Sequence, residues 1–300
     1  MDILVPLSDI DHIERFSVAG ADEFYFGFRD ECWDRKFGIY EEINRMSSFG
    51  SKANFIIDDI DSVIRKIHSY NKKAFLTLNS FKYSSQQLRY FDSIFKHFSS
   101  IDGVIISDAA LIPKLREYGI SVTMSTIAGC YNSLIVGYYK KAGADRIVLP
   151  RDIQLDDAEK IISVHKDLKY EMFIMRNGCK YSDSQCCAFH ARKYGSMCSC
   201  IDNSRNNFYF TQNTDSDFIR ETFSNNKLFT MAFHKNTCGI CAVERMKKMN
   251  ISSLKIVGRA DDPLSVEKDI KIIRSLISEK SNKKDYYENC LYGLNCYYKK

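Results

Sequence analysis

Cysteines are concentrated in one short stretch, RNGCKYSDSQCCAFHARKYGSMCSC, which runs from residue 176 to residue 200. Five of the chain's 11 cysteines fall in these 25 residues, directly after an apolar run that is typical of a buried strand. An odd number of thiols argues against a disulfide framework, and reduced thiols serve either as ligands or as inert buried side chains. The stretch therefore predicts a metal or cluster site.

The spacing of the thiols leaves three kinds of site open. The candidate ligands follow the apolar run or begin a later helical pattern: Cys179, Cys186, Cys198 or Cys200, and Cys238 or Cys241. An iron–sulfur cluster takes four thiolates that a fold can gather from distant segments. Structural zinc sites use two short cysteine pairs, and here only 198/200 and 238/241 look like pairs. The spacing favours a cluster, with zinc and free thiols as the alternatives.

Other kinds of chemistry leave weaker signals. The sequence has no G-x-S-x-G, H-E-x-x-H or G-x-x-x-x-G-K motif, so no established hydrolase or phosphate-cradling constellation is present. Its six histidines are scattered, and His190, within the thiol-rich stretch, is interpreted as a neighbour rather than a ligand. A net charge of +5 permits contact with RNA or another anionic partner without requiring it.

The elements that must position these residues alternate along the chain. Helical patterns such as 60–67 and 264–277 separate eight apolar runs, which is the rhythm of repeated strand–helix units. The runs are Ile3–Val5, Glu23–Phe26, Ala74–Leu78, Val104–Ile106, Ser121–Met124, Arg146–Leu149, Glu171–Ile174 and Leu254–Ile256. They predict an α/β fold, a TIM-barrel-like (β/α)₈ barrel, with a doubly wound open sheet as the alternative.

Two segments interrupt this rhythm. Residues 179–224, after the seventh strand, are too long for a simple connecting loop and are interpreted as a Cys-rich functional insertion. The predicted organisation is a barrel-like catalytic domain over 1–278, which contains that insertion, and a basic tail over 279–300. The tail carries Cys290 and Cys296 beside tyrosines, and its thiols are interpreted as inert rather than as extra ligands.

Polar residues follow the predicted strands, at the end where barrels place their chemistry. The candidate pocket residues are Asn79, Asp108, Thr126, Arg151 and Arg259, and the last four are the candidate catalytic residues. Asp108, Arg151 and Arg259 are expected to face one cavity, where the guanidinium groups would bind a carboxylate or phosphate. The alternative is that strand ends are polar simply because they leave the core.

The start of the chain predicts a cytoplasmic location. Residues 1–6, MDILVP, have no basic segment before the apolar run, and that run stops at Pro6. No stretch approaches the roughly 20 apolar residues of a membrane span.

Several motifs together resemble peptidase family U-32, the collagenase-like proteases and their relatives, over residues 20–259. AGADEFYFG, IISDAALI, STIAGCYN and IVLPRDIQLDD are similar to its conserved stretches. NGCKYSDSQC reproduces the family's GxxCxxxSxxC motif, and GSMCSC supplies a third cysteine. TCGICAVERMKKMNISSLKIVGR resembles the family's Cys–helix–KIEGR ending, except that Val257 stands in place of Glu. The start, VPLSDID, and the tail, CLYGLNCYY, have no counterpart in this resemblance.

The resemblance implies a barrel-like fold and a 4Fe–4S cluster. Its ligands would be Cys179, Cys186, Cys198 and Cys238, with Cys200 and Cys241 as substitutes for the last two. Studied members hydroxylate ubiquinone precursors or RNA bases without oxygen, and others are described as collagen-degrading proteases. The expected function is therefore iron–sulfur-dependent modification of an RNA, quinone-like or peptide substrate. The alternatives are a collagenase-like protease and a non-catalytic, metal-stapled accessory subunit of a partner protein.

Overall fold

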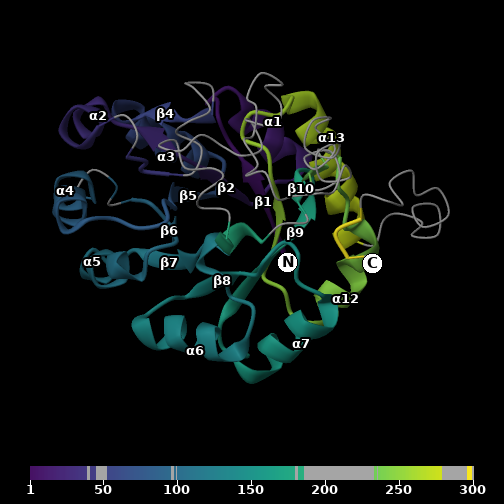
Figure 1. The fold of residues 1–300 in the computed structure, drawn as a ribbon. Coiled ribbons are helices and arrows are strands. Elements are labelled where there is room, and N and C mark those ends of the chain that lie inside the picture. Colours follow the sequence, from purple (N-terminus) through teal and green to yellow (C-terminus); the bar gives the residue numbers. More distant parts are fainter. Residues whose placement is uncertain are drawn as a thin grey trace, which may run out of the picture.

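A closed parallel barrel forms the centre of the molecule. The computed structural model describes residues 1–38, 41–44, 53–95, 98, 100–179, 182–185, 233–234, 236–278 and 296–298. The strands pair in the order β1-β12-β9-β8-β7-β6-β5-β2 and close on themselves (Figure 1). They are β1 Asp2–Pro6, β2 Glu23–Phe26, β5 Lys73–Leu78, β6 Gly103–Ile106, β7 Ser121–Met124, β8 Arg146–Val148, β9 Lys169–Met175 and β12 Ser253–Ile256. The predicted (β/α)₈ barrel is confirmed, and the open sheet is excluded.

Helices surround the barrel and cover its outer face (Figure 1). They are α1 His12–Ala19, α2 Glu31–Phe37, α3 Ile60–Ser69, α4 Ser85–Phe95, α5 Ile112–Glu117, α6 Ser133–Ala142, α7 Leu155–Val164, α12 Val243–Lys248 and α13 Pro263–Ile277. Short 3-10 turns η3 Ile57–Asp59, η4 Ala109–Leu111, η5 Thr126–Ala128, η6 Asp183–Gln185 and η7 Ile240–Ala242 join them to the strands. Two small sheets lie outside the barrel, β3 Phe28–Arg29 with β4 Phe55–Ile56, and β10 Gly178–Cys179 with β11 Phe233–His234.

The two helices predicted from their periodicity show why the sequence folds this way. In α3, residues 60, 63, 64 and 67 are all apolar and buried, so one stripe of the helix packs against the strands. In α13, the Asp262 side chain accepts a hydrogen bond from the backbone N–H of Ser265, and Pro263 occupies the first turn. Such a start satisfies an N–H group that lacks a partner within the helix.

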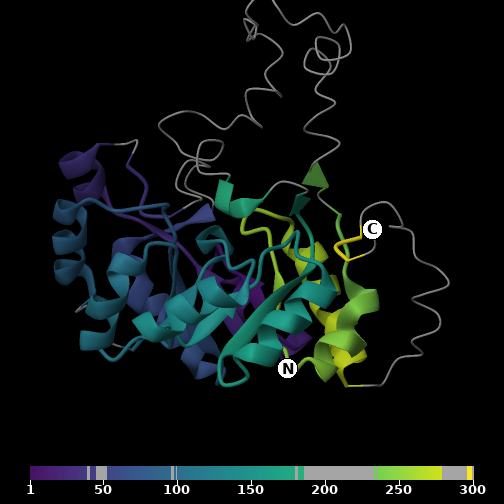
Figure 2. The ribbon, with the colours of Figure 1, turned by 60° about the horizontal axis from the view of Figure 1, so that its bottom comes forward.

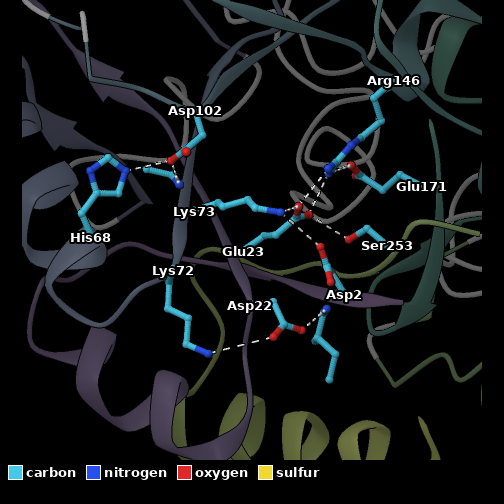
Figure 3. A network of polar contacts seen from close by, with 12 residues as sticks. Asp2, Asp22, Glu23, His68, Lys72, Lys73, Asp102, Arg146, Glu171 and Ser253 are labelled. Atoms are coloured by element: carbon cyan, nitrogen blue, oxygen red, sulfur yellow. Dashed lines mark hydrogen bonds and ion pairs between the residues drawn. The ribbon is translucent and has the colours of Figure 1, made fainter. Parts of the chain in front are cut away.

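Charged side chains fill the lower part of the barrel, at the amino ends of the strands. The Arg146 guanidinium donates to both carboxylate oxygens of Glu23, at 2.7 and 2.8 Å, and lies 3.7 Å from Glu171 (Figure 3). Lys255 donates to Glu171 at 2.6 Å, and the Ser253 hydroxyl donates to Glu23 at 3.0 Å. Both carboxylates are fully buried, so the charges of this layer compensate one another away from water.

Apolar layers separate this charged layer from the opposite end of the barrel. One cluster at mid-height contains Leu4, Tyr25, Phe75 and Ile105. A second cluster contains Val148, Phe173, Val257 and Tyr297. Tyr297 comes from the C-terminal tail, so a residue remote in sequence closes part of the upper end. We call that end, at the carboxyl ends of the strands, the barrel mouth.

The predicted division into a domain and a tail falls largely on residues outside the described ranges. Of the insertion 179–224, the structure describes 179 and 182–185, and of the tail 279–300 it describes 296–298. These pieces lie at the barrel mouth. Figure 2 shows β10, β11 and η6 at one end of the barrel, with the N-terminus at the other.

Candidate active site at the barrel mouth

A sharp turn after β9 presents Cys179. Arg176 and Asn177 have φ angles of 69° and 47°, in the left-handed region of backbone conformation that residues other than glycine rarely adopt. The backbone N–H of Arg176 donates to the Thr237 carbonyl at 2.7 Å, and that of Gly178 donates to the Thr237 hydroxyl at 3.1 Å. Strained backbone held by its surroundings is common at functional sites, where each such residue costs about 1–3 kcal/mol.

The glycine of the NGC motif is required by this turn. A Cβ on Gly178 would lie 2.3 Å from the Thr237 hydroxyl oxygen, closer than real Cβ contacts. Beyond it, Cys179 pairs with Phe233 across the antiparallel β10–β11 ladder, and Met175 forms a backbone bridge with Cys238. Cys179 and Cys238 therefore lie on two chain segments that are hydrogen-bonded to each other directly above β9.

The cysteines predicted as ligands divide into described and undescribed residues. Cys186, Cys187, Cys198, Cys200 and Cys290 lie outside the described residues. Cys179 and Cys238 are half-buried, Cys241 is exposed in η7, and Cys296 forms a parallel backbone bridge with Cys238. Within the described ranges, no three His, Cys, Asp or Glu side chains converge on a metal position.

Cys179 differs in its surroundings from a thiol of the core. It lies close enough to Arg151 for a charge on its sulfur to interact with the guanidinium, and iron–sulfur clusters are held by cysteine thiolates. Cys130 provides the contrast, because it is fully buried in the core and burial raises the pKa of its thiol to about 12. Cys130 therefore stays protonated and does not suit a ligand role.

Asp183 brings two of the predicted catalytic residues together. Its Oδ2 accepts a hydrogen bond from Arg151 Nε at 2.5 Å and another from the Thr126 hydroxyl at 3.0 Å. Arg151 also donates to the carbonyl of Asn177, within the turn that presents Cys179, and its guanidinium lies 4.9 Å from the centre of the Phe173 ring. Asp183 is 3% exposed, and the sequence analysis missed it. Its position between Cys179 and Cys186 in the cysteine motif could have identified Asp183 as a candidate site residue.

Arg151 is thus already paired with a negative charge. Burial alone would lower the pKa of its guanidinium, but the nearby Asp183 carboxylate outweighs burial and raises that pKa. Arg151 serves to hold η6 and the turn after β9 against the barrel.

Arg259 is more deeply buried than Arg151, at 5% exposed, and has different partners. It donates to Asn54 Oδ1 at 2.9 Å, Asn44 Oδ1 at 3.3 Å and the Thr77 hydroxyl at 3.4 Å, all neutral groups. Burial lowers the pKa of its guanidinium to about 10. Of the five N–H donors that an arginine carries, these contacts use three. The two others lie on the Nε–Nη2 edge, whose fork matches a carboxylate or phosphate.

Gly27 makes room for this arrangement. A Cβ at that position would lie 2.1 Å from Arg259 Nη1 and 2.3 Å from Asn54 Oδ1. The amide of Asn44 is fixed in turn, because its Nδ2 donates to the Phe28 carbonyl at 2.9 Å. We call Arg259, Asn44, Asn54 and Thr77 the Arg259 cradle.

Arg151 and Arg259 both lie near Tyr25, which points into the barrel. Burial raises the pKa of the Tyr25 phenol, and the charges of Arg259 and Arg151 act to lower it. The charges of the two guanidinium groups, which follow β8 and β12, therefore act on the same interior side chain.

The Asp108 side chain and the Asn79 backbone take part in hydrogen bonds between loops at the mouth. The Asp108 carboxylate accepts from the N–H of Ala110 at 3.0 Å, which caps η4, and from the N–H of Tyr83 at 2.9 Å. The Asn79 carbonyl accepts from the Ser107 hydroxyl at 3.4 Å. The contacts of Asp108 assign it to loop positioning, and its catalytic role stays a prediction.

The C-terminal tail supplies a wall of the mouth that the sequence analysis did not assign. The Tyr297 ring stacks on Phe173 with centroids 6.1 Å apart, and its hydroxyl donates to the Arg176 carbonyl. The hydroxyl of Tyr298 donates to the Phe173 carbonyl at 2.5 Å. These contacts fold the end of the tail back onto the barrel.

Comparison with known proteins supports the family expected from the motifs. The model of peptidase family U32 matches residues 8–294. A solved structure of a U32 peptidase, Mk0906, superposes with a TM-score of 0.51 at 9% identity, covering 86% of this chain and 94% of that one. At that identity the superposition shows the fold alone. None of the described helices is long and apolar enough to cross a membrane.

Two curated relatives match most of the chain at low identity. A Helicobacter pylori (strain J99) protein named tRNA hydroxylation protein P is 24% identical over 79% of this chain and 57% of its own length. A Methanocaldococcus jannaschii protein named as an uncharacterized protease is 24% identical over 92% of this chain and 65% of its own. The chain thus spans less than two thirds of the length of these two relatives. By the match over nearly its whole length, the chain belongs to peptidase family U32.

Proposed function

We propose that this protein is an iron–sulfur enzyme that modifies its substrate by oxygen-independent hydroxylation. The main support for this proposal is the hydrogen-bonded turn after β9, in which Cys179 lies beside the segment of Cys238 at the barrel mouth. Cys179, Cys186, Cys198 and Cys238 would hold a 4Fe–4S cluster, and zinc is the alternative occupant. When bound, such a cluster supplies electron transfer or Lewis-acid activation.

The residues around the turn have separate tasks in this proposal. Arg151 lies close to Cys179 and, through Asp183, holds Thr126 and η6 in place. The Arg259 cradle binds an anionic group of the substrate or co-substrate through its unused N–H edge, because every partner of Arg259 among the described residues is neutral. The loop between Asn44 and Asn54 cannot supply a carboxylate either, since residues 45–53, RMSSFGSKA, contain no acidic residue.

The substrate class is proposed from the relatives. Several are named for tRNA hydroxylation, which favours RNA over a quinone-like or peptide substrate, and a net charge of +5 is compatible with RNA. A cytoplasmic location accords with that substrate. A protein partner subunit is a further proposal. A protease is the alternative favoured by the name of the archaeal relative.

Nucleoside mass spectrometry tests this function. Total tRNA from a strain that lacks the gene is compared with tRNA from strains that carry the wild-type gene, the Cys179→Ala variant or the Cys32→Ala variant. Cys32 is exposed on α2 and serves as the matched control. A hydroxylated nucleoside should disappear in the deletion strain, return with wild type and Cys32→Ala, and stay absent with Cys179→Ala.

Other outcomes redirect the assignment. A change in quinone precursors with unchanged tRNA would replace RNA by a quinone-like substrate. Cleavage of gelatin by the purified wild type but not by Cys179→Ala would favour the protease.

A further inference from the structure

The end of the C-terminal tail touches both segments that carry the described candidate ligands. The backbone N–H of Tyr297 donates to the carbonyl of Cys238 at 2.9 Å, and its hydroxyl donates to the carbonyl of Arg176. Arg176 begins the turn that presents Cys179. One tail residue is therefore hydrogen-bonded to the Cys238 segment through its backbone and to the Cys179 turn through its side chain.

The contacts around Tyr297 form a packed unit. Tyr297 is 8% exposed, stacks on Phe173 and packs against Val148 and Val257 inside the mouth. Tyr298 anchors the next position, because its hydroxyl donates to the Phe173 carbonyl and its ring covers Gly239. A Cβ on Gly239 would lie 2.8 Å from the Tyr298 ring.

The place that Tyr297 covers is lined by Val257, which packs with it in one cluster. A carboxylate in that position would be buried against two aromatic rings, at a high desolvation cost. Val257 and the end of the tail are thus physically linked, as parts of one apolar wall.

We propose that tail residues 296–298 form a strap that positions the cluster thiols, with Tyr297 as the positioning residue that fixes Cys179 relative to Cys238. This deepens the proposed function and rests on its cluster. Tyr297 acts through the two chain segments and not as a ligand. Cys296, whose backbone lies about 5 Å from that of Cys238 across their bridge, contributes its main chain rather than its thiol.

The strap is tested in the full-length chain by two measurements. The first is hydrogen exchange at the backbone N–H groups of Arg176 and Gly239, which donate to Thr237 and Ile174. The second is the rate at which anaerobic protein releases iron to a chelator, followed by its visible absorption. The variants are Tyr297→Ala, Tyr297→Phe and Cys296→Ala. Tyr139→Phe is the control, because it removes a hydroxyl that donates to Ala128 at 3.2 Å away from the strap.

We expect Tyr297→Ala to accelerate both exchange and iron release by at least about tenfold, which corresponds to ~1.4 kcal/mol. Tyr297→Phe keeps the ring and loses one hydrogen bond, so we expect about a threefold to tenfold effect. Tyr139→Phe and Cys296→Ala should match wild type in iron release. Iron release is measured well below the melting temperature of each variant, so that general unfolding does not contribute.

Each remaining outcome overturns part of the proposal. Faster exchange with unchanged iron release would make the strap structural only. Iron loss on Cys296→Ala would make that thiol a ligand. Unchanged exchange in Tyr297→Ala would remove the strap altogether. If wild type binds no iron, the cluster fails, while the exchange data still decide whether the strap holds the two segments together.

Discussion

Two buried arginines at opposite ends of the barrel have opposite surroundings. Arg146, at the amino ends of the strands, has both oxygens of Glu23 within 2.8 Å and a second carboxylate nearby (Figure 3). Arg259, at the mouth, contacts two amide oxygens and a hydroxyl. Burial opposes the charge of both, yet the carboxylates raise the pKa of Arg146, whereas the pKa of Arg259 falls to about 10.

The difference separates a stabilising region from a binding region. A buried ion pair whose partners are all present gains nothing from a ligand, and removing one partner leaves a charge uncompensated. When all partners of a buried guanidinium are neutral, no opposite charge offsets its desolvation. An anionic ligand would provide that charge. The bottom of the barrel therefore holds the fold together, and we propose that the mouth departs from the most stable arrangement for the sake of ligand binding.

The largest effect on stability is expected at the bottom of the barrel. Arg146→Met leaves Glu23 buried without its main partner, which should cost about 3–5 kcal/mol of unfolding free energy. Urea denaturation of the wild type and the variant measures this loss. The double variant Arg146→Met with Glu23→Leu removes both charges and should recover much of the stability. A single variant that is as stable as wild type would show that the network is not a stabilising unit.

A smaller loss is expected where Arg151 meets Asp183. Lysine keeps the charge but cannot donate to both the Asp183 carboxylate and the Asn177 carbonyl, so one contact of the pair is lost. We expect Arg151→Lys to lower the unfolding free energy by about 1.5–3 kcal/mol, the range for a charged hydrogen bond. The matched control is Arg245→Lys, because Arg245 pairs with Asp156 and Glu159 on the surface. Equal stability of the two lysine variants would contradict the specific role of Arg151.

The smallest stability effect and the clearest ligand effect are expected at Arg259. Arg259→Gln should change the unfolding free energy by no more than about 1–2 kcal/mol, since lost hydrogen bonds are offset by removal of an uncompensated charge. Inorganic phosphate or benzoate should raise the melting temperature of wild type but not of Arg259→Gln. Arg245→Gln, with the same change in net charge, should respond like wild type. An equal response of all three proteins would refute the anion site.

Elements formed by nearby residues could be predicted from the sequence, and contacts between distant ones could not. The eight strands and helices α3 and α13 follow from apolar periodicity, which local sequence carries. The Arg259 cradle joins residues separated by 205 positions, as between Arg259 and Asn54. Tyr297 reaches Arg176 across 121 positions, from a tail that shows no strand or helix pattern. Such contacts depend on the tertiary fold of the whole chain. The asparagines and tyrosines that form them do not belong to a recognisable sequence motif.

The central claim, a cluster at the mouth held by four cysteines, is tested most directly by the visible spectrum of anaerobically purified protein. Wild-type protein should absorb visible light at about 400 nm and contain iron and sulfide in the ratio of a 4Fe–4S cluster. Cys238→Ala should lose this absorption, and Cys187→Ala should keep it, because both thiols of an adjacent pair rarely reach one metal centre without strain. Wild-type protein with zinc and no iron, or a Cys238→Ala variant with an unchanged spectrum, would contradict the account.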